Sequence, residues 1–348
     1  MNREPRSCPD CGDPPQMARR TFLTAAGATA AAVSLGLPAT ARAAEEPAKS
    51  APESLVKTLY GTLTPKQKET ICFAWDHQDP KRGLLRTRIS NNWHITEPII
   101  SSEFYTKDQQ QLVRAIFEGI IQPDWQKRVD KQLQDDAGGW GKSQNIAIFG
   151  NPNDGKFELV ITGRHMTLRC DGNSTEHMAF GGPIFYGHAA SGFYEKPGHP
   201  NNVYWPQAQA AGSVYSMLDG KQRAKALIES SPEEIDVAFK SEQPGIRVGE
   251  LSKDQQENVQ KVLQKLLEPY RQSDRDEVGT CLKAQGGLEA CHLAFFKEGD
   301  LNPSDNDWDI WRLQGPSFVW SFRGVPHVHV WVNISDSPKV ALNSASLG

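Results

Sequence analysis

Four segments of the chain begin with the side-chain pattern of a helix N-terminus. Thr64-Pro65-Lys66-Gln67 combines an N-cap threonine with glutamine at the third helical position, which is the signature of a capping box. The same pattern predicts helix starts at Thr106, Ser231 and Ser252. Two of these helices then carry apolar residues three or four positions apart, namely Leu112, Ile116 and Ile120 in one and Val259, Val262, Leu263, Leu266 and Leu267 in the other.

Other segments alternate apolar and polar residues with the period of a β-strand. Residues 157–161 alternate in this way, and the pattern resumes at Met166 and Leu168 after Gly163. Near the C-terminus, Gly/Pro turns separate three short alternating segments, 308–313, 317–323 and 327–334, and this spacing is typical of an antiparallel meander. Strands in two blocks with helices between them predict an α+β fold. We expect an antiparallel sheet built from two strand blocks (about 145–186 and 308–334), packed with several amphipathic helices.

The first 43 residues read as a twin-arginine signal peptide. Arg19-Arg20-Thr21-Phe22-Leu23 precedes an Ala-rich apolar stretch, and Ala41-Arg42-Ala43 offers a small-x-small cleavage site. The apolar stretch is too short for a permanent membrane anchor. We therefore expect the twin-arginine export machinery as a partner and a periplasmic or secreted protein, with a flexible linker at 44–54 and one α+β domain at 55–348.

The net charge and the cysteine content indicate which partners and which covalent bonds to expect. The formal net charge is −4 and the chain has no basic stripe, which argues against nucleic acid as a partner. Four cysteines remain after the signal peptide, and an even number in an oxidising compartment predicts disulfides. Cys281 and Cys291 flank a Gly-Gly turn and are the favoured pair, whereas Cys72 and Cys170 are either bridged or buried thiols.

The strand at 327–334 carries the first candidate site. Its side chains alternate between a face of Val328, Val330, Val332 and Ile334 and a face of His327, His329, Trp331 and Asn333. Histidines two positions apart on a strand lie side by side, and imidazole is a preferred ligand of zinc and copper. The pattern is equally compatible with a polar face turned to solvent.

A second group of polar residues accompanies the strand block near residue 165. His165 and Arg169 alternate with Met166 and Leu168, and His177, His188 and the adjacent Glu176 follow. If the two blocks join in one sheet, three or four of these histidines can lie close enough together to form one site. We expect His165, His327 and His329 as metal ligands, with His188 or His177 as a fourth ligand or a supporting group.

These residues favour an exported metal-dependent enzyme. Zinc or copper is the expected ion, with iron as a third choice, and the reaction is either hydrolytic or oxidative on a small-molecule or glycan substrate. In the hydrolytic version Glu176 is the general base of a metal-activated water and Arg169 holds an anionic group.

Two alternatives remain open. In the first, the protein binds a metal without catalysis, or binds glycans through Trp308, Trp311, Trp320 and Trp331. In the second, the protein is a metal-free enzyme that uses His165 and His327 as acid and base, and its activity would survive a chelator.

Several short motifs together resemble one known family. The run at 163–169, Gly-Arg-His-Met-Thr-Leu-Arg, looks like a Gly-His-His-Leu-Ser-Leu-Asn signature, and the run at 183–187 resembles its companion Pro-x-Phe-x-Gly. The runs at 312–316 and 327–331 resemble a third element, in which a His-x-His-x-x-Trp strand follows a Gly-Pro turn. Over roughly residues 55–335 the chain is similar to the secreted bacterial family called domain of unknown function 3500.

The resemblance implies that His165, His327 and His329 occupy the family's histidine positions. The chain departs from the pattern at Arg164, which stands where the signature has its first histidine, and at His188, where a small polar residue is expected. Val332-Asn333 replaces an Arg-Asp pair after the tryptophan.

Overall fold

A computed structural model describes residues 51–172, 175–189, 199, 202–300, 308–340 and 343. The predicted signal peptide, residues 1–43, lies outside the described residues, as do residues 44–50 of the predicted linker. The first helix begins at Pro52, so the last residues of that linker are helical. No helix in the described part of the chain is long and apolar enough to cross a membrane.

Eight α-helices flank the sheet within the described residues, in two groups of four. The first group consists of α1 (Pro52–Thr62), α2 (Pro65–Ile71), α3 (Lys107–Ile120) and α4 (Pro123–Ala137), and the second of α5 (Trp205–Met217), α6 (Gly220–Ala226), α7 (Lys253–Leu267) and α8 (Gln272–Ala284). The capping boxes predicted at Thr64, Thr106 and Ser252 are confirmed. The helix predicted to start at Ser231 is absent, and residues 231–240 form an irregular loop.

Eleven strands form one large, mostly antiparallel sheet. They are β1 (Cys72–Phe73), β4 (Asn145–Asn151), β5 (Lys156–Gly163), β6 (Met166–Cys170), β7 (Ile184–His188), β8 (Leu227–Ile228), β9 (Ile246–Arg247), β10 (His292–Phe296), β11 (Ile310–Gly315), β12 (Phe318–Arg323) and β13 (Val328–Ile334). The order is β1-β4-β5-β6-β7-β13-β12-β11-β10-β8, with β9 also paired to β10. The mixed α and β composition and the antiparallel sheet agree with the prediction. The two predicted blocks cover only part of this sheet, because β1, β8, β9 and β10 lie outside them.

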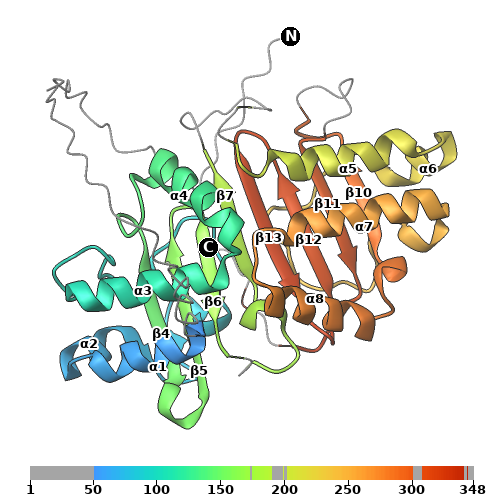
Figure 1. Cartoon of the computed structure of the whole chain (residues 1–348). Helices are drawn as coiled ribbons and strands as arrows, with labels where there is room; N and C mark the ends of the chain where they lie inside the picture. The colour runs from blue at the N-terminus through green and yellow to red at the C-terminus, as the bar shows by residue number, and fades with distance from the viewer. Residues whose placement is uncertain are drawn as a thin grey trace, which may run out of the picture.

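The two halves of the molecule repeat the same order of elements. Each half runs through two helices, a short strand, two further helices and four antiparallel strands, apart from the additional β9 in the second half and a separate hairpin of β2 (Gln78–Asp79) and β3 (Gly83–Leu84) in the first. The short strands β1 and β8 pair in parallel with β4 and β10, the corresponding strands of their own halves. The halves meet where β7 pairs with β13, at the centre of the sheet (Figure 1).

A pair of glutamine side chains supports the repeat at atomic detail. The side chain of Gln67 at the start of α2 bonds to that of Gln109 at the start of α3. Gln222 at the start of α6 bonds to Gln255 at the start of α7 in the same way. The Lys-Asp-Gln-Gln sequences that begin α3 and α7 therefore occupy equivalent places in a repeated unit.

The two faces of the sheet are covered differently. The helices all lie on one face (Figure 1), where they bury the main core. On the opposite face, the loop after β1 places Leu85 and Trp93 against strands β4 and β5. The loop after β8 places Val237 against Val319 and Trp331. Because both faces are covered, polar side chains on the loop-covered face are removed from solvent.

The four cysteines of the described residues are free, so the predicted Cys281–Cys291 disulfide is wrong for this structure. Cys281 lies on α8 with its Sγ 4.0 Å from the carbonyl oxygen of His177. The Sγ of Cys291 lies 3.9 Å from the carbonyl oxygen of Gly287. The two thiols therefore contact different segments, although they are close in sequence.

Candidate metal centre

His329 on strand β13 and His327 just before that strand both lie on the loop-covered face of the sheet. Val328 and Val330 pack into the main core beneath the helices, whereas Trp331 belongs to the cluster on the opposite face. The predicted division of the strand into two faces is therefore confirmed. His327 and His329 are fully buried, which excludes the alternative of a polar face turned to solvent.

His165 reaches the same place from a hairpin turn and not from a strand. Gly163 pairs with Met166, so Arg164 and His165 form the two-residue turn between β5 and β6. His165 has a φ of 51°, a left-handed conformation that costs a non-glycine residue free energy. Its backbone N–H donates to the carbonyl oxygen of Asn91 at 3.0 Å. From this turn the ring extends over Gly187 of β7 to His327 and His329.

Gly187 on β7 leaves the space that this crossing requires. It is paired with His329 in the sheet register. A Cβ atom at Gly187 would lie 2.4 Å from the carbonyl oxygen of Val328 and 3.3 Å from a ring carbon of His165. Any side chain at this position would displace the His165 ring or separate the two strands.

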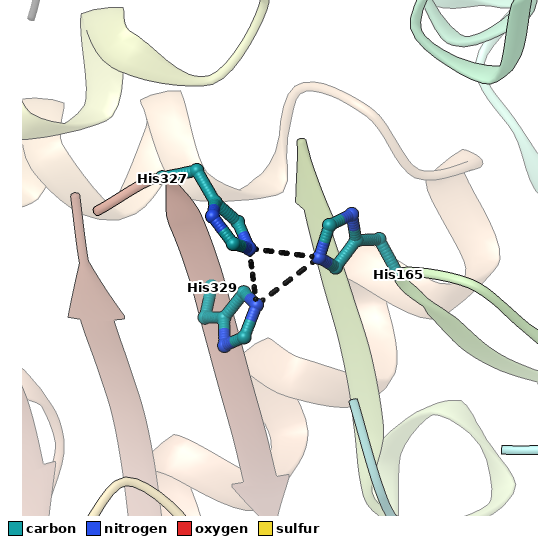
Figure 2. A group of neighbouring side chains, drawn as sticks. All are labelled: His165, His327 and His329. Carbon is teal, nitrogen blue, oxygen red and sulfur yellow. Dashed lines mark hydrogen bonds between the residues drawn. The ribbon is translucent and has the colours of Figure 1, made fainter. Parts of the chain in front are cut away.

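The three imidazoles converge through the same ring nitrogen (Figure 2). The Nε2 atom of His165 lies 3.1 Å from the Nε2 atoms of both His327 and His329, which are 3.0 Å from each other. All three side chains are buried. Among the described residues this is the one group of three or more His, Cys, Asp or Glu side chains that could hold a metal ion.

Two carboxylates fix the outer nitrogens of two of these rings. Asp136, at the end of α4, hydrogen-bonds Nδ1 of His165, and Glu234 accepts from Nδ1 of His329 at 2.8 Å. A carboxylate only accepts hydrogen bonds, so Nδ1 carries the proton in both rings. In the neutral imidazoles, Nε2 of His165 and of His329 therefore directs a lone pair into the centre of the triad.

Each carboxylate is also paired with an arginine. Arg164 donates to Asp136 at 2.9 Å, and Arg323 forms an ion pair with Glu234. Burial alone would raise the pKa of the Asp136 carboxyl, but His165 and Arg164 outweigh it and hold that pKa below its ordinary value. Burial, reinforced by Arg323, pushes the pKa of His329 well below its ordinary value. The first shift favours the charged form of Asp136, and the second favours the neutral form of the His329 ring.

Aromatic rings form one wall of the site. The ring centroid of Phe185 lies 5.2 Å from that of His329 and 4.8 Å from that of Trp331. The Trp331 indole N–H also donates to Glu234 at 3.1 Å. The wall therefore excludes water on one side of His329 and helps to hold the carboxylate that orients it.

Four further residues expected at the site are placed elsewhere. His177 is exposed and bonds to Asp336, and the neighbouring Glu176 is also exposed. Arg169 is buried in a separate network, where it pairs with Glu158 and donates to backbone carbonyl oxygens. His188 lies opposite Val328 in the register and so faces the helix layer. The structure does not bring these residues into the triad.

A pH experiment tests the buried state of His188. Burial lowers the pKa of His188 to about 4, whereas histidine in an unfolded chain titrates near 6.5. Between these values the unfolded chain binds a proton that the folded chain excludes. Protonation therefore costs stability as the pH falls from about 6.5 toward 4, and it costs none above about 6.5. The full difference corresponds to about 3 kcal/mol.

The measurement is the free energy of unfolding of the wild type and of His188→Gln at about pH 7.5 and about pH 4.5. Burial raises the pKa of Asp274 to about 6 and that of Glu277 to about 7. Protonation of these two carboxyls stabilises the folded state as the pH falls, and it does so in the wild type and the variant alike. We expect the wild type to lose at least about 2 kcal/mol more than the variant over this range. Equal losses would show that His188 is accessible to protons in the folded protein.

The two carboxylates at the site were not predicted from the sequence. Asp136 follows another aspartate at the end of a helix, and Glu234 lies in the segment that was predicted to begin a helix at Ser231. The four tryptophans considered for glycan stacking are buried and belong to the two cores, namely Trp308, Trp311, Trp320 and Trp331.

Comparison with known proteins identifies the family. A family model described as "Protein of unknown function (DUF3500)" matches residues 45–334, and the chain belongs to this family. The match covers all three histidines of the triad and both carboxylates. No curated protein and no solved structure gave a significant match.

Proposed function

We propose that this member of the DUF3500 family is an exported metal-dependent enzyme whose ion is bound by His165, His327 and His329. The observation that carries the proposal is the convergence of three buried Nε2 atoms within 3.0–3.1 Å of one another. With Nδ1 protonated on His165 and His329, at least two lone pairs meet at that distance. Such an arrangement is unfavourable unless a cation lies between them.

The spacing of the nitrogens suits a first-row transition metal. Zinc binds imidazole nitrogen at about 2.0–2.1 Å. Three nitrogens that are 3.0–3.1 Å apart could all bind one ion at that distance. His165, His327 and His329 would then supply three ligands and leave a fourth position to a small molecule. Closed structural sites use four protein ligands, so an open position favours a catalytic site over a structural one.

The ligand set favours zinc or copper, with iron as a third choice. When bound, such an ion supplies Lewis-acid or redox chemistry to the molecule at its open position. The protein's own part is to orient two of the imidazoles through Asp136 and Glu234, and to exclude water on the side of Phe185. We propose no role for Glu176 or Arg169 at this centre, because Glu176 is exposed and the donors of Arg169 are used in another network.

Export through the twin-arginine route is part of the same proposal. It is supported by the arginine pair and cleavage site within residues 18–43. This route carries proteins that have folded already, so a metal can be bound before the protein leaves the cell.

The test is elemental analysis of the protein exported by its native host, followed by activity screens with and without a chelator. We expect about one zinc, copper or iron ion per chain, and an activity that the chelator abolishes and the same ion restores. Activity that survives complete metal removal would favour the metal-free alternative. A stoichiometric ion that binds no added small-molecule ligand, seen in the spectrum of the cobalt- or copper-loaded protein, would favour a binding protein.

A further inference from the structure

A second site lies on the loop-covered face of the sheet, in the C-terminal half. The loop of residues 229–244 and strands β10–β12 enclose a pocket of about 230 Å³. Its lining includes the apolar residues Phe296, Val319 and Ile228 and the polar residues Gln314, Lys240 and Arg312. A mostly apolar hollow with a few polar groups is the usual composition of a site for a small organic molecule.

Arg312 gives this pocket its chemical character. The residue is 4% exposed, and it forms no ion pair with a carboxylate in the part of the chain that the structure describes. Its guanidinium donates one hydrogen bond to the carbonyl oxygen of Asp236 at 2.7 Å and one to that of Glu233 at 2.9 Å. These contacts use two of the five N–H donors of an arginine.

The charge of Arg312 persists at neutral pH although the site is buried. Burial lowers the pKa of the guanidinium to about 10, against the opposing effect of Asp236 and Glu234. Asp236 is itself paired with Lys240. A buried positive charge held only by carbonyl oxygens is costly, and an anionic ligand would offset that cost.

We infer that this pocket binds a small organic acid, with its carboxylate on Arg312 and its apolar body against Phe296 and Val319. A guanidinium binds a carboxylate with two parallel hydrogen bonds, which gives both affinity and orientation. The apolar wall favours such a ligand over inorganic phosphate, because phosphate has no apolar surface to pack against Phe296 and Val319. The inference is independent of the metal centre.

The pocket and the metal centre share the loop of residues 229–244. Glu233 and Asp236 hold Arg312, and Glu234 between them holds His329. A ligand in the pocket therefore contacts the segment that carries one support of the triad.

The test is calorimetric titration of the metal-free protein with hexanoate, hexanamide and inorganic phosphate. We expect hexanoate to saturate one site with a Kd below about 1 mM, and hexanamide and phosphate to bind at least about tenfold more weakly. Arg312→Gln should weaken hexanoate binding by at least about tenfold. Arg247→Gln removes an exposed arginine of β9 and should change nothing.

A second variant covers the case in which Arg312→Gln fails to fold. Ala238 is an exposed residue on the pocket lining, so Ala238→Trp should fill the pocket without removing the bonds of Arg312. We expect it to abolish hexanoate binding. The inference is overturned if hexanoate shows no saturable binding, if hexanamide binds equally well, or if the folded variants bind hexanoate like the wild type.

Discussion

Replacing both His327 and His329 with alanine should reduce the bound metal from about one ion per chain to less than about a tenth. A single imidazole on the hairpin turn would remain, and one neutral ligand cannot hold a transition metal against water and buffer. Both residues are fully buried and their rings meet at the centre of the site, so no other described group can substitute for them. The measurement is elemental analysis of the purified variant, before and after dialysis against the ion.

The matched control is His177→Ala. The sequence predicted His188 or His177 as a fourth ligand or a supporting group, but the His177 side chain is 59% exposed and bonds to Asp336. It should retain the full metal content. Far-ultraviolet circular dichroism must show that the double variant is folded, because removing two buried rings leaves a cavity. A folded double variant that still binds one ion tightly would place the metal elsewhere and contradict the proposed site.

Local patterns predicted those elements whose signals lie within a few residues. The capping boxes at Thr64, Thr106 and Ser252 form because side chain and backbone are three residues apart. The two faces of β13 follow from the period of a strand. The Ser231 segment has the same local signal, but its backbone carbonyl oxygens at Glu233 and Asp236 accept hydrogen bonds from Arg312 of strand β11. Tertiary contacts override the capping signal there.

The composition of the site depended on contacts that no short pattern encodes. The triad joins His165 to His329 across 164 residues, and Glu234 joins it from 95 residues away. The sequence indicated the three histidines because two share the strand predicted at 327–334 and the third lies in a recognisable motif. It gave no reason to prefer Asp136 over Asp135, or Glu234 over Glu176, because carboxylates of the same type occur throughout the chain.

The repeat explains why the triad lies where it does. The first half contributes His165, and the second half contributes His327 and His329, on either side of the β7–β13 junction. The second half has an equivalent two-residue turn between Gly315 and Phe318, in which Ser317 takes the place of His165. Ser317 donates to the carbonyl oxygen of Ser335. The two halves share a framework but carry different side chains at the corresponding turn, so the centre is asymmetric.

Asp136→Asn and Glu234→Gln should each weaken metal binding by about 10–100-fold while leaving all three ligands in place. Each carboxylate accepts the Nδ1 proton of one ligand, which fixes the ring and makes Nε2 a stronger donor to the ion. The amide keeps the size of the side chain but removes the charge, and it can turn its NH₂ group toward the ring. The measurement is competition for the ion with a chelator of known affinity.

Asp135→Asn and Glu233→Gln are matched controls, since each makes the same charge change one residue away. Asp135 pairs with Lys131 on α4, and the side chain of Glu233 is exposed. If the hydrogen bond to Nδ1 is the cause, the controls bind the ion like the wild type. Equal weakening in a control and its partner would mean that only the summed charge near the site matters.

Stability must be separated from affinity in this experiment. Asp136 is almost fully buried beside Arg164, and removing one partner of a buried ion pair costs about 3–5 kcal/mol. Affinities are therefore compared at a temperature well below the unfolding transition of each variant. A variant that loses stability but keeps its affinity would assign Asp136 to the fold alone. A loss of affinity in the folded state, with its control unchanged, would show that the carboxylate tunes the imidazole as a metal ligand.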